Sequence, residues 1–124
     1  MPSVETILTI DDLDVHYGGS RILRDVSMDI PNGSIVAVMG RNGVGKTSLL
    51  RGLTGHTPIR SGSVTWDGEN ISRLPPFARA RRGIAYVPQV RDVFPRLSVE
   101  ENLMTGFACL TRSEARIPAH VFEL

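Results

Sequence analysis

The stretch from Gly40 to Thr47, GRNGVGKT, has the spacing G-x-x-x-x-G-K-[ST] of a phosphate-binding loop. Gly40, Gly43 and Gly45 allow the backbone to curl so that several N–H groups point at phosphate oxygens. Lys46 would reach the β- and γ-phosphates of a nucleoside triphosphate, and the hydroxyl of Thr47 would ligate Mg²⁺. These residue types therefore predict the binding of a nucleotide together with its metal ion.

Such a loop needs a buried strand before it and a helix after it. Residues 34–39 (SIVAVM) form a continuous apolar run, which predicts a strand buried on both faces of a parallel sheet. Residues 46–54 have helical spacing, and Gly55 is expected to end the helix. The apolar stripe of this helix consists of Leu49, Leu50 and Leu53. Strand, loop and helix in this order favour a bound nucleotide over an empty glycine-rich turn.

Strands are predicted before the loop and short mixed elements after it. Residues 4–10 and 13–17 are expected to form a hairpin-like or continuous edge element, and residues 22–30 alternate as a half-buried strand does. The later elements are a strand at 63–66 with a turn at 67–68, a helix at 76–82, a strand at 84–87 and a helix at 98–110. Ser98 and Glu101 have the spacing of a capping box at the start of the last helix.

Bulk properties fit one globular domain and exclude several classes. Of the 124 residues, 41% are hydrophobic and 22% charged, and the net charge of +1 gives no electrostatic footprint for nucleic acid or an anionic membrane. The longest uninterrupted apolar run, residues 35–39, is too short to span a bilayer, and the acidic N-terminus does not resemble a signal peptide. Cys109, the single cysteine, cannot form an internal disulfide, and Lys46 is the only lysine. We expect a cytosolic protein.

Several separated stretches resemble the ATP-binding subunits of ABC transporters, from about Leu8 to the last residue. Tyr17, in VHYGG, matches the A-loop aromatic that stacks on adenine in that family. GRNGVGKTSLL matches the Walker A motif, and IRSGSVTWDG (59–68) matches the segment that follows it. YVPQ (86–89) places Gln89 as the Q-loop glutamine, which touches Mg²⁺ and the attacking water. The order of these motifs makes the resemblance specific.

The resemblance implies an α/β fold, a P-loop NTPase core with an antiparallel β subdomain, truncated before the helical subdomain. Residues 1–110 would be the N-terminal part of the nucleotide-binding domain and 111–124 the start of the helical subdomain. Gln89 would be catalytic and, with Thr47, a ligand of Mg²⁺. The residues expected to bind ATP are Tyr17, Gly40, Asn42, Gly43, Gly45, Lys46, Thr47 and Ser48.

The resemblance also implies partners and a class of transported substrate. A second ATP-binding subunit and transmembrane permease subunits are expected, with the protein peripheral at the inner face of the membrane. VPQVRDVFPRLSVEENL (87–103) resembles the branched-chain amino acid importer class, and Gln89 with the GRNGVGKT loop is most similar to its urea-importer branch. Val90 stands where the family usually has glycine and stiffens the Q-loop backbone. Phe94 is expected at the surface that docks the permease.

The family's hydrolytic motifs do not follow Gln89 in this sequence. They are an LSGGQ-like signature, a Walker B aspartate with its neighbouring glutamate, and a switch histidine. The final VFEL resembles the entry to the helical subdomain. We therefore expect the full-length subunit to be an ATPase and this chain alone to be inactive. A stand-alone, non-catalytic nucleotide-binding module is the alternative, whereas Tyr17 and YVPQ argue against a P-loop kinase.

Other patterns favour structural interpretations. TILTIDD (6–12) mimics a Walker B strand, but it precedes the loop, so Asp11 is expected in a solvated turn. ARARRG (78–83) is interpreted as a helix C-terminus whose dipole favours cations, rather than as an RNA or phosphate contact. The three histidines lack metal-ligand spacing, and Trp66 and Phe77 are expected to serve in packing.

Overall fold

The computed structural model describes residues 5–41, 43, 45–90, 93–109 and 116–123. The chain divides into two compact units, Met1–Arg79 and Ala80–Leu124. The predicted boundary between residues 110 and 111 lies outside the described residues. None of the helices in these described ranges is long and apolar enough to cross a membrane.

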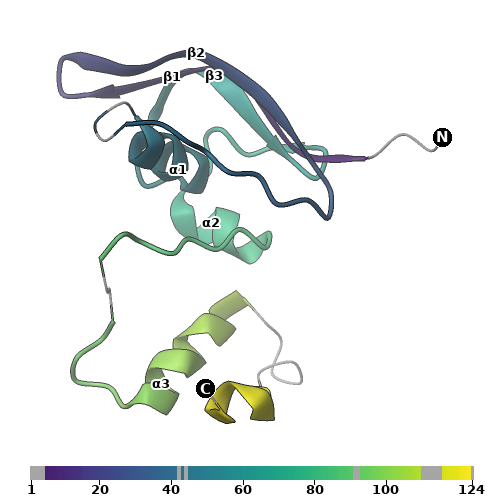
Figure 1. Cartoon of the computed structure of the whole chain (residues 1–124), viewed down its shortest axis with the longest axis vertical. Helices are drawn as coiled ribbons and strands as arrows, with labels where there is room; N and C mark the ends of the chain where they lie inside the picture. Colours follow the sequence, from purple (N-terminus) through teal and green to yellow (C-terminus); the bar gives the residue numbers. More distant parts are fainter. Residues whose placement is uncertain (1–4, 42, 44, 91–92, 110–115, 124) are drawn as a thin grey trace. The chain divides into compact units, whose positions relative to one another are not determined.

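The first unit contains a four-stranded antiparallel sheet with the strand order β2-β1-β3-β4 (Figure 1). Its strands are β1 (Thr6–Tyr17), β2 (Ser20–Pro31), β3 (Ile59–Trp66) and β4 (Glu69–Asn70). The predicted strands 4–10 and 13–17 are one continuous strand, but the expectation of an edge position is wrong. β1 pairs with β2 on one side and with β3 on the other, including residues 63–66 of the predicted strand. β3 itself starts at Ile59 rather than at the predicted Ser63.

Helix α1 (Lys46–Thr54) has the predicted bounds and lies against the sheet (Figure 1). Gly52 permits this approach, since a methyl group there would come within 3.2 Å of Val15 Cγ2. Of the predicted leucine stripe, Leu49 is buried, while Leu50 is exposed. The apolar core of the described residues consists of Leu8, Ile10, Leu13, Val15, Leu23, Leu49, Val64 and Ile71.

A bulge in β1 turns three consecutive side chains inward. The pairing register shifts between Ile10 and Leu13, and Asp12 adopts a left-handed φ of 44°. Gly62 of β3 lies against this bulge, and a methyl group there would come within 2.3 Å of the Asp12 carbonyl oxygen. Residues 13–15 are all buried as a result, so the bulge carries the carboxylate of Asp14 into the core side of the hairpin.

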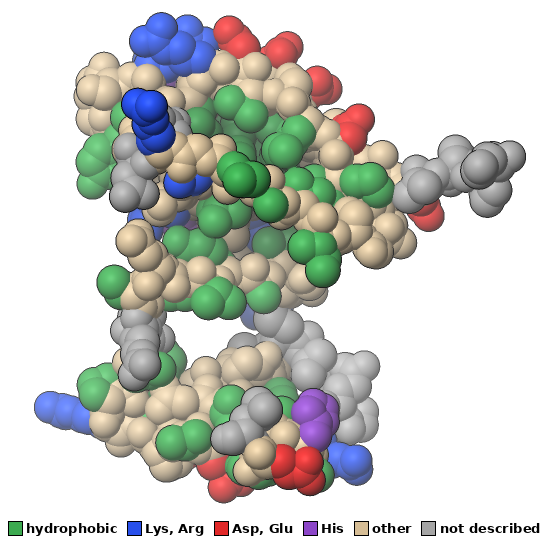
Figure 2. Space-filling model, in the orientation of Figure 1, with side chains coloured by type: hydrophobic (Ala, Val, Ile, Leu, Met, Phe, Trp, Pro, Cys, Tyr) green, Lys and Arg blue, Asp and Glu red, His purple; other side chains and the backbone are tan. Residues whose placement is uncertain are grey.

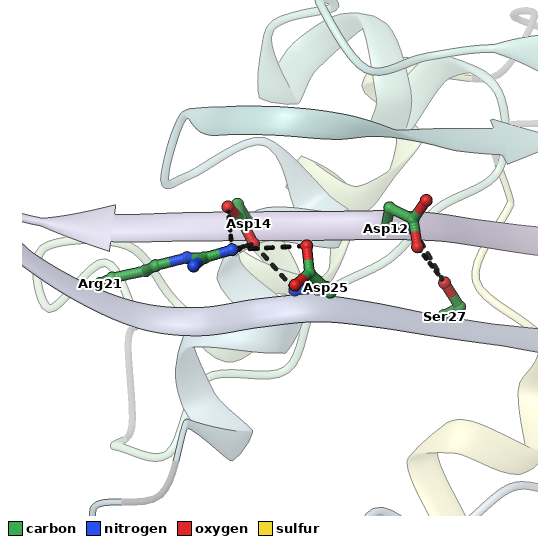
Figure 3. Close-up of polar contacts among 5 residues, drawn as sticks. All are labelled: Asp12, Asp14, Arg21, Asp25 and Ser27. Carbon is green, nitrogen blue, oxygen red and sulfur yellow. Dashed lines mark hydrogen bonds and ion pairs between the residues drawn. The ribbon is translucent and has the colours of Figure 1, made fainter.

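The buried carboxylate of Asp14 ties the two strands of the hairpin together (Figure 3). Arg21 Nη2 lies 2.6 Å from Asp14 Oδ2 and 2.8 Å from Asp14 Oδ1. The backbone N–H of Asp25 donates to Asp14 Oδ1 at 2.8 Å. The Arg21 hydrogen bond, helped by the Asp25 amide, lowers the pKa of Asp14 from 3.8 to about 2. The ionised form of Asp14 is therefore the one that the folded hairpin stabilises.

The guanidinium of Arg79, on α2 (Pro76–Arg81), is buried against the end of α1. Arg79 is 2% exposed. Its Nη1 donates to the carbonyl oxygens of Gly52 and Leu53, both at 2.8 Å. Its Nε donates to Leu74 O at 2.9 Å and its Nη2 to Ser72 O at 3.0 Å. The basic cluster at 78–83 thus includes a residue that binds helix carbonyls, but those of α1 rather than those of its own helix.

The second unit contains α3 (Val99–Met104), η1 (Thr105–Cys109) and η2 (Ala119–Glu123). The predicted capping box is confirmed: Ser98 N donates to Glu101 Oε2 at 2.7 Å, and Glu101 N donates to Ser98 Oγ at 3.1 Å. The predicted helix 98–110 is an α-helix only as far as Met104 and then tightens to a 3₁₀ turn.

Asn102 fixes the preceding loop, because its amide donates to Phe94 O at 3.1 Å and to Leu97 O at 3.2 Å.

Two predicted strands are absent from the described residues. Residues 34–39 and 84–87 form no strand, and Ile35 is 101% and Met39 88% exposed. A strand buried on both faces needs partners on both sides, and no described strand pairs with either segment. Hydrophobic side chains consequently lie on the surface of the chain (Figure 2). Phe77 is also exposed, which differs from its predicted packing role, whereas Trp66 is half-buried.

Replacing Arg79 with methionine should destabilise the first unit strongly. The substitution keeps an apolar stem but removes the four hydrogen bonds that the guanidinium donates, and the cost should be about 3 kcal/mol or more. Urea unfolding followed by circular dichroism measures the effect. Arg73→Met, at an exposed arginine on the same segment, is the matched control and should change the midpoint little. Equal midpoints for the two variants would contradict the role given to Arg79.

The Asp14–Arg21 ion pair should make stability fall in acid. The pKa of Asp14 is depressed in the folded chain, so the pair's contribution is complete above about pH 4 and is lost as the pH falls through 2. Thermal midpoints of wild type and Asp14→Asn should differ at pH 7 and converge near pH 2. Asp12→Asn, a second carboxylate of the same strand, serves as control. A difference that stays constant across this range would refute the assignment.

Candidate functional site

The loop from Gly40 to Thr47 leads directly into the N-terminus of α1. Gly45 is the N-cap residue, with φ 111°, and its carbonyl oxygen accepts from Leu49 N at 2.8 Å. Gly45 has no side chain to cap this helix end, and the first turn of α1 contains no acidic residue. The first N–H groups of the helix are therefore left for an external acceptor, and the positive end of the helix dipole favours an anion there.

Lys46 lies across this loop. Its Nζ donates a hydrogen bond to the carbonyl oxygen of Gly40, at the other end of the predicted motif. The ammonium group is thus held over the loop backbone, where an incoming phosphate oxygen would meet it. Thr47 is exposed and Ser48 half-buried in the first turn of α1, so two hydroxyls adjoin the same helix end. Asn42, also predicted to bind nucleotide, lies outside the described residues.

The loop abuts the hairpin formed by β1 and β2. A methyl group on Gly45 would come within 2.7 Å of Leu23 Cδ2, and the left-handed φ of 111° favours glycine at this position. Tyr17 pairs with Ser20 at the turn of the same hairpin and is 75% exposed. Leu23 and Ile22, which adjoin Gly45, are therefore a few residues along β2 from the turn that carries Tyr17.

Gln89 is exposed and belongs to the second unit, so its predicted contact with Mg²⁺ stays a prediction. In the first unit, the hydroxyl of Thr47 is the oxygen donor that the loop itself offers to a metal ion. Within the described ranges, no group of three or more His, Cys, Asp or Glu side chains could hold a metal ion without a ligand's help. Mg²⁺ commonly combines few protein ligands with phosphate oxygens and water, and this donor set fits such an ion.

The Asp14–Arg21 ion pair was not found in the sequence. Asp14 and Arg21 flank the turn that carries Tyr17, and they form an ion pair on the two strands below it (Figure 3). Opposite charges on either side of the Gly18-Gly19 turn were the available signal. The bulge at Asp12 could not be read from the alternation pattern, and the bulge is what brings Asp14 inward.

Comparison with known proteins gives the family. The family model described as "ABC transporter" matches residues 23–123. The chain is 43% identical over 100 residues to the high-affinity branched-chain amino acid transport ATP-binding protein BraG of Pseudomonas aeruginosa, covering 81% of this chain and 43% of that protein. It is 45% identical over 97 residues to the lipopolysaccharide export system ATP-binding protein LptB of Escherichia coli K12, covering 78% and 40%.

A third relative and a solved structure agree. The probable branched-chain amino acid transport ATP-binding protein LivF of Archaeoglobus fulgidus is 42% identical over 104 residues, which are 84% of this chain and 44% of that protein. A structure of an ATP-binding subunit of an ABC transporter superposes with a TM-score of 0.76 and 27% identity, over 94% of this chain and 50% of that one. The predicted fold class is thereby confirmed. The chain spans less than half the length of these curated relatives, and it belongs to the ATP-binding subunits of the ABC transporter family.

Proposed function

We propose that this chain is the ATP-binding, energy-coupling part of a transporter subunit and that it binds ATP with Mg²⁺ at the N-terminus of α1. The observation that carries the proposal is the uncapped helix end with Lys46 held across the loop. A triphosphate supplies both the negative charge and the acceptors that this end lacks. Membership of the ABC transporter family supports ATP as the nucleotide.

Each predicted residue has a distinct task in this proposal. Backbone N–H groups of Gly40, Gly43 and Gly45, together with Asn42, surround the phosphates, and Lys46 neutralises the β- and γ-phosphates. The hydroxyl of Thr47 and the side chain of Gln89 would hold Mg²⁺, which would help to neutralise the charge of the phosphates, and the hydroxyl of Ser48 would also serve the phosphates. Tyr17 stacks on adenine. The exposure of its side chain at the hairpin turn supports that role.

We further propose that the subunit serves an importer for branched-chain amino acids or urea. Two of the relatives are named for branched-chain amino acid transport, which supports the first substrate class, although LptB is named for lipopolysaccharide export. Urea rests only on the stretch around Gln89. Permease subunits and a second ATP-binding subunit are the proposed partners, which would hold the protein at the inner face of the membrane. Exposed Val90 and Phe94 of the second unit suit a permease contact.

A stand-alone, non-catalytic nucleotide-binding module is the second candidate. In this candidate the loop from Gly40 to Thr47 binds a nucleotide that the protein does not hydrolyse. The coding sequence beyond codon 124 discriminates between the two candidates. A downstream frame with both motifs would support the transporter subunit, and a natural stop with neither would support the module.

Lys46→Ala should weaken ATP binding, because it removes the side-chain charge that faces the β- and γ-phosphates. A charge-assisted hydrogen bond contributes about 1.5–3 kcal/mol. Calorimetric titration with ATP and Mg²⁺ measures the difference. Arg73→Met, which changes a surface charge away from the loop, is the control and should bind as wild type does. Equal affinity of wild type and Lys46→Ala would rule out the proposed phosphate site.

The 124-residue chain should bind ATP without turning it over. Phosphoryl transfer needs an oriented water and charge around the γ-phosphate, and Lys46 with the loop amides supplies only part of this. Phosphate release is measured at millimolar Mg-ATP, with Lys46→Ala reporting any contaminating ATPase. Steady turnover that disappears in this variant would mean that the chain contains catalytic groups beyond those described.

A further inference from the structure

We propose that the Asp14–Arg21 ion pair is a positioning device for the base end of the nucleotide site. In this inference, which rests on the proposed function, the pair holds the β1–β2 turn so that Tyr17 meets an adenine ring whose phosphates occupy the loop before α1. The pair touches neither the base nor the phosphates. It acts through the placement of the strand that carries Tyr17.

The first step is that the hairpin is irregular on both strands at one level, where a single carboxylate ties them together. The register of β1 shifts between Leu13 and Val15, and Asp25 on β2 adopts a left-handed φ of 46°. Asp14 accepts from both the Arg21 guanidinium and the Asp25 amide, at 2.8 Å each (Figure 3). Arg21 Nη2 also lies 3.4 Å from Asp25 Oδ1. Without Asp14 these irregular segments would lose their common acceptor.

The second step is that this same level of the hairpin packs on α1. Val15 pairs with Leu23 across the hairpin. Leu23 abuts Gly45 at the start of α1, and Val15 abuts Gly52 within it. Along the strands, Arg21 lies on the turn side of the packed Val15–Leu23 pair and Asp14 on its far side, so the ion pair spans the packed part of the hairpin. It can set the direction in which the turn, with Tyr17, leaves the helix that carries the phosphate-binding groups.

The third step distinguishes the positioning of Tyr17 from a general electrostatic effect, because the two predict opposite changes in ATP affinity for Asp14→Asn. Asp14→Asn removes a negative charge near a site for anions, so charge alone would tighten the binding of every phosphate ligand. Misplacement of Tyr17 instead weakens only a ligand that has a base. Inorganic tripolyphosphate can use the loop and Lys46 but offers no ring for stacking. The two ligands therefore respond differently if the ion pair positions Tyr17.

The experiment measures the affinities of Mg-ATP and Mg-tripolyphosphate by calorimetry for wild type and Asp14→Asn, at a temperature where both are folded. We expect the ATP affinity of Asp14→Asn to fall by about tenfold, part of the contribution of base–aromatic stacking, with tripolyphosphate binding unweakened. Asp12→Asn is the matched control. It makes the same chemical change on the same strand, at a left-handed residue where asparagine is tolerated, and should leave both affinities unchanged.

A double-mutant cycle with Tyr17→Ala tests whether Asp14→Asn changes the ATP affinity through Tyr17. Tyr17→Ala alone should weaken ATP binding, and adding Asp14→Asn to it should cost nothing more. Arg21→Lys keeps the cation but not the planar fork, and it is a second way to disrupt the ion pair if Asp14→Asn does not fold. It should likewise weaken the binding of ATP and leave the binding of tripolyphosphate unweakened. Equal losses for both ligands, no loss for ATP, or additive losses with Tyr17→Ala would overturn the inference. A wild-type chain that binds neither ligand would instead overturn the proposed function.

Discussion

The first unit depends on how the two ends of α1 are held. At the C-terminal end of α1, the almost fully buried guanidinium of Arg79 donates to the carbonyl oxygens of Gly52 and Leu53. It also donates to the carbonyl oxygens of Ser72 and Leu74, which precede α2. Burial lowers the pKa of Arg79, so desolvation opposes its charge, and the four acceptors offset that cost. A cation at this helix end also complements the dipole. The position of α1 against the sheet follows from this contact.

The opposite end of the helix has the complementary design. Gly45 allows the closest approach to β2, and no acidic or capping side chain satisfies the first N–H groups. One helix therefore has its negative end closed by a protein cation and its positive end left open for an external anion. The stability provided by Arg79 and the binding proposed for Lys46 are thus two uses of the same aligned backbone dipoles.

Local signals in the sequence predicted what local physics determines. The bounds of α1 and the Ser98–Glu101 capping box are confirmed, because each depends on residues within one helical turn of the feature. The segments 34–39 and 84–87 were predicted as strands from their apolar runs, but a strand exists only when a partner accepts its hydrogen bonds. Among the described residues none does so. Composition could indicate that these segments suit a buried sheet, and it could not supply the neighbouring strands.

The candidate site also has a part that local sequence predicts and a part that depends on distant segments. The proposed phosphate end could be predicted because its residues are contiguous, from Gly40 to Thr47, and the chain itself brings them together. The base end depends on a hairpin whose register changes at a bulge, and alternation of apolar residues gives no warning of such a change. Gly62 of β3 lies against the bulge at the Asp12 carbonyl, a contact between segments far apart in the sequence. Asp14 follows this bulge and pairs with Arg21, and neither residue belongs to the predicted nucleotide-binding motifs.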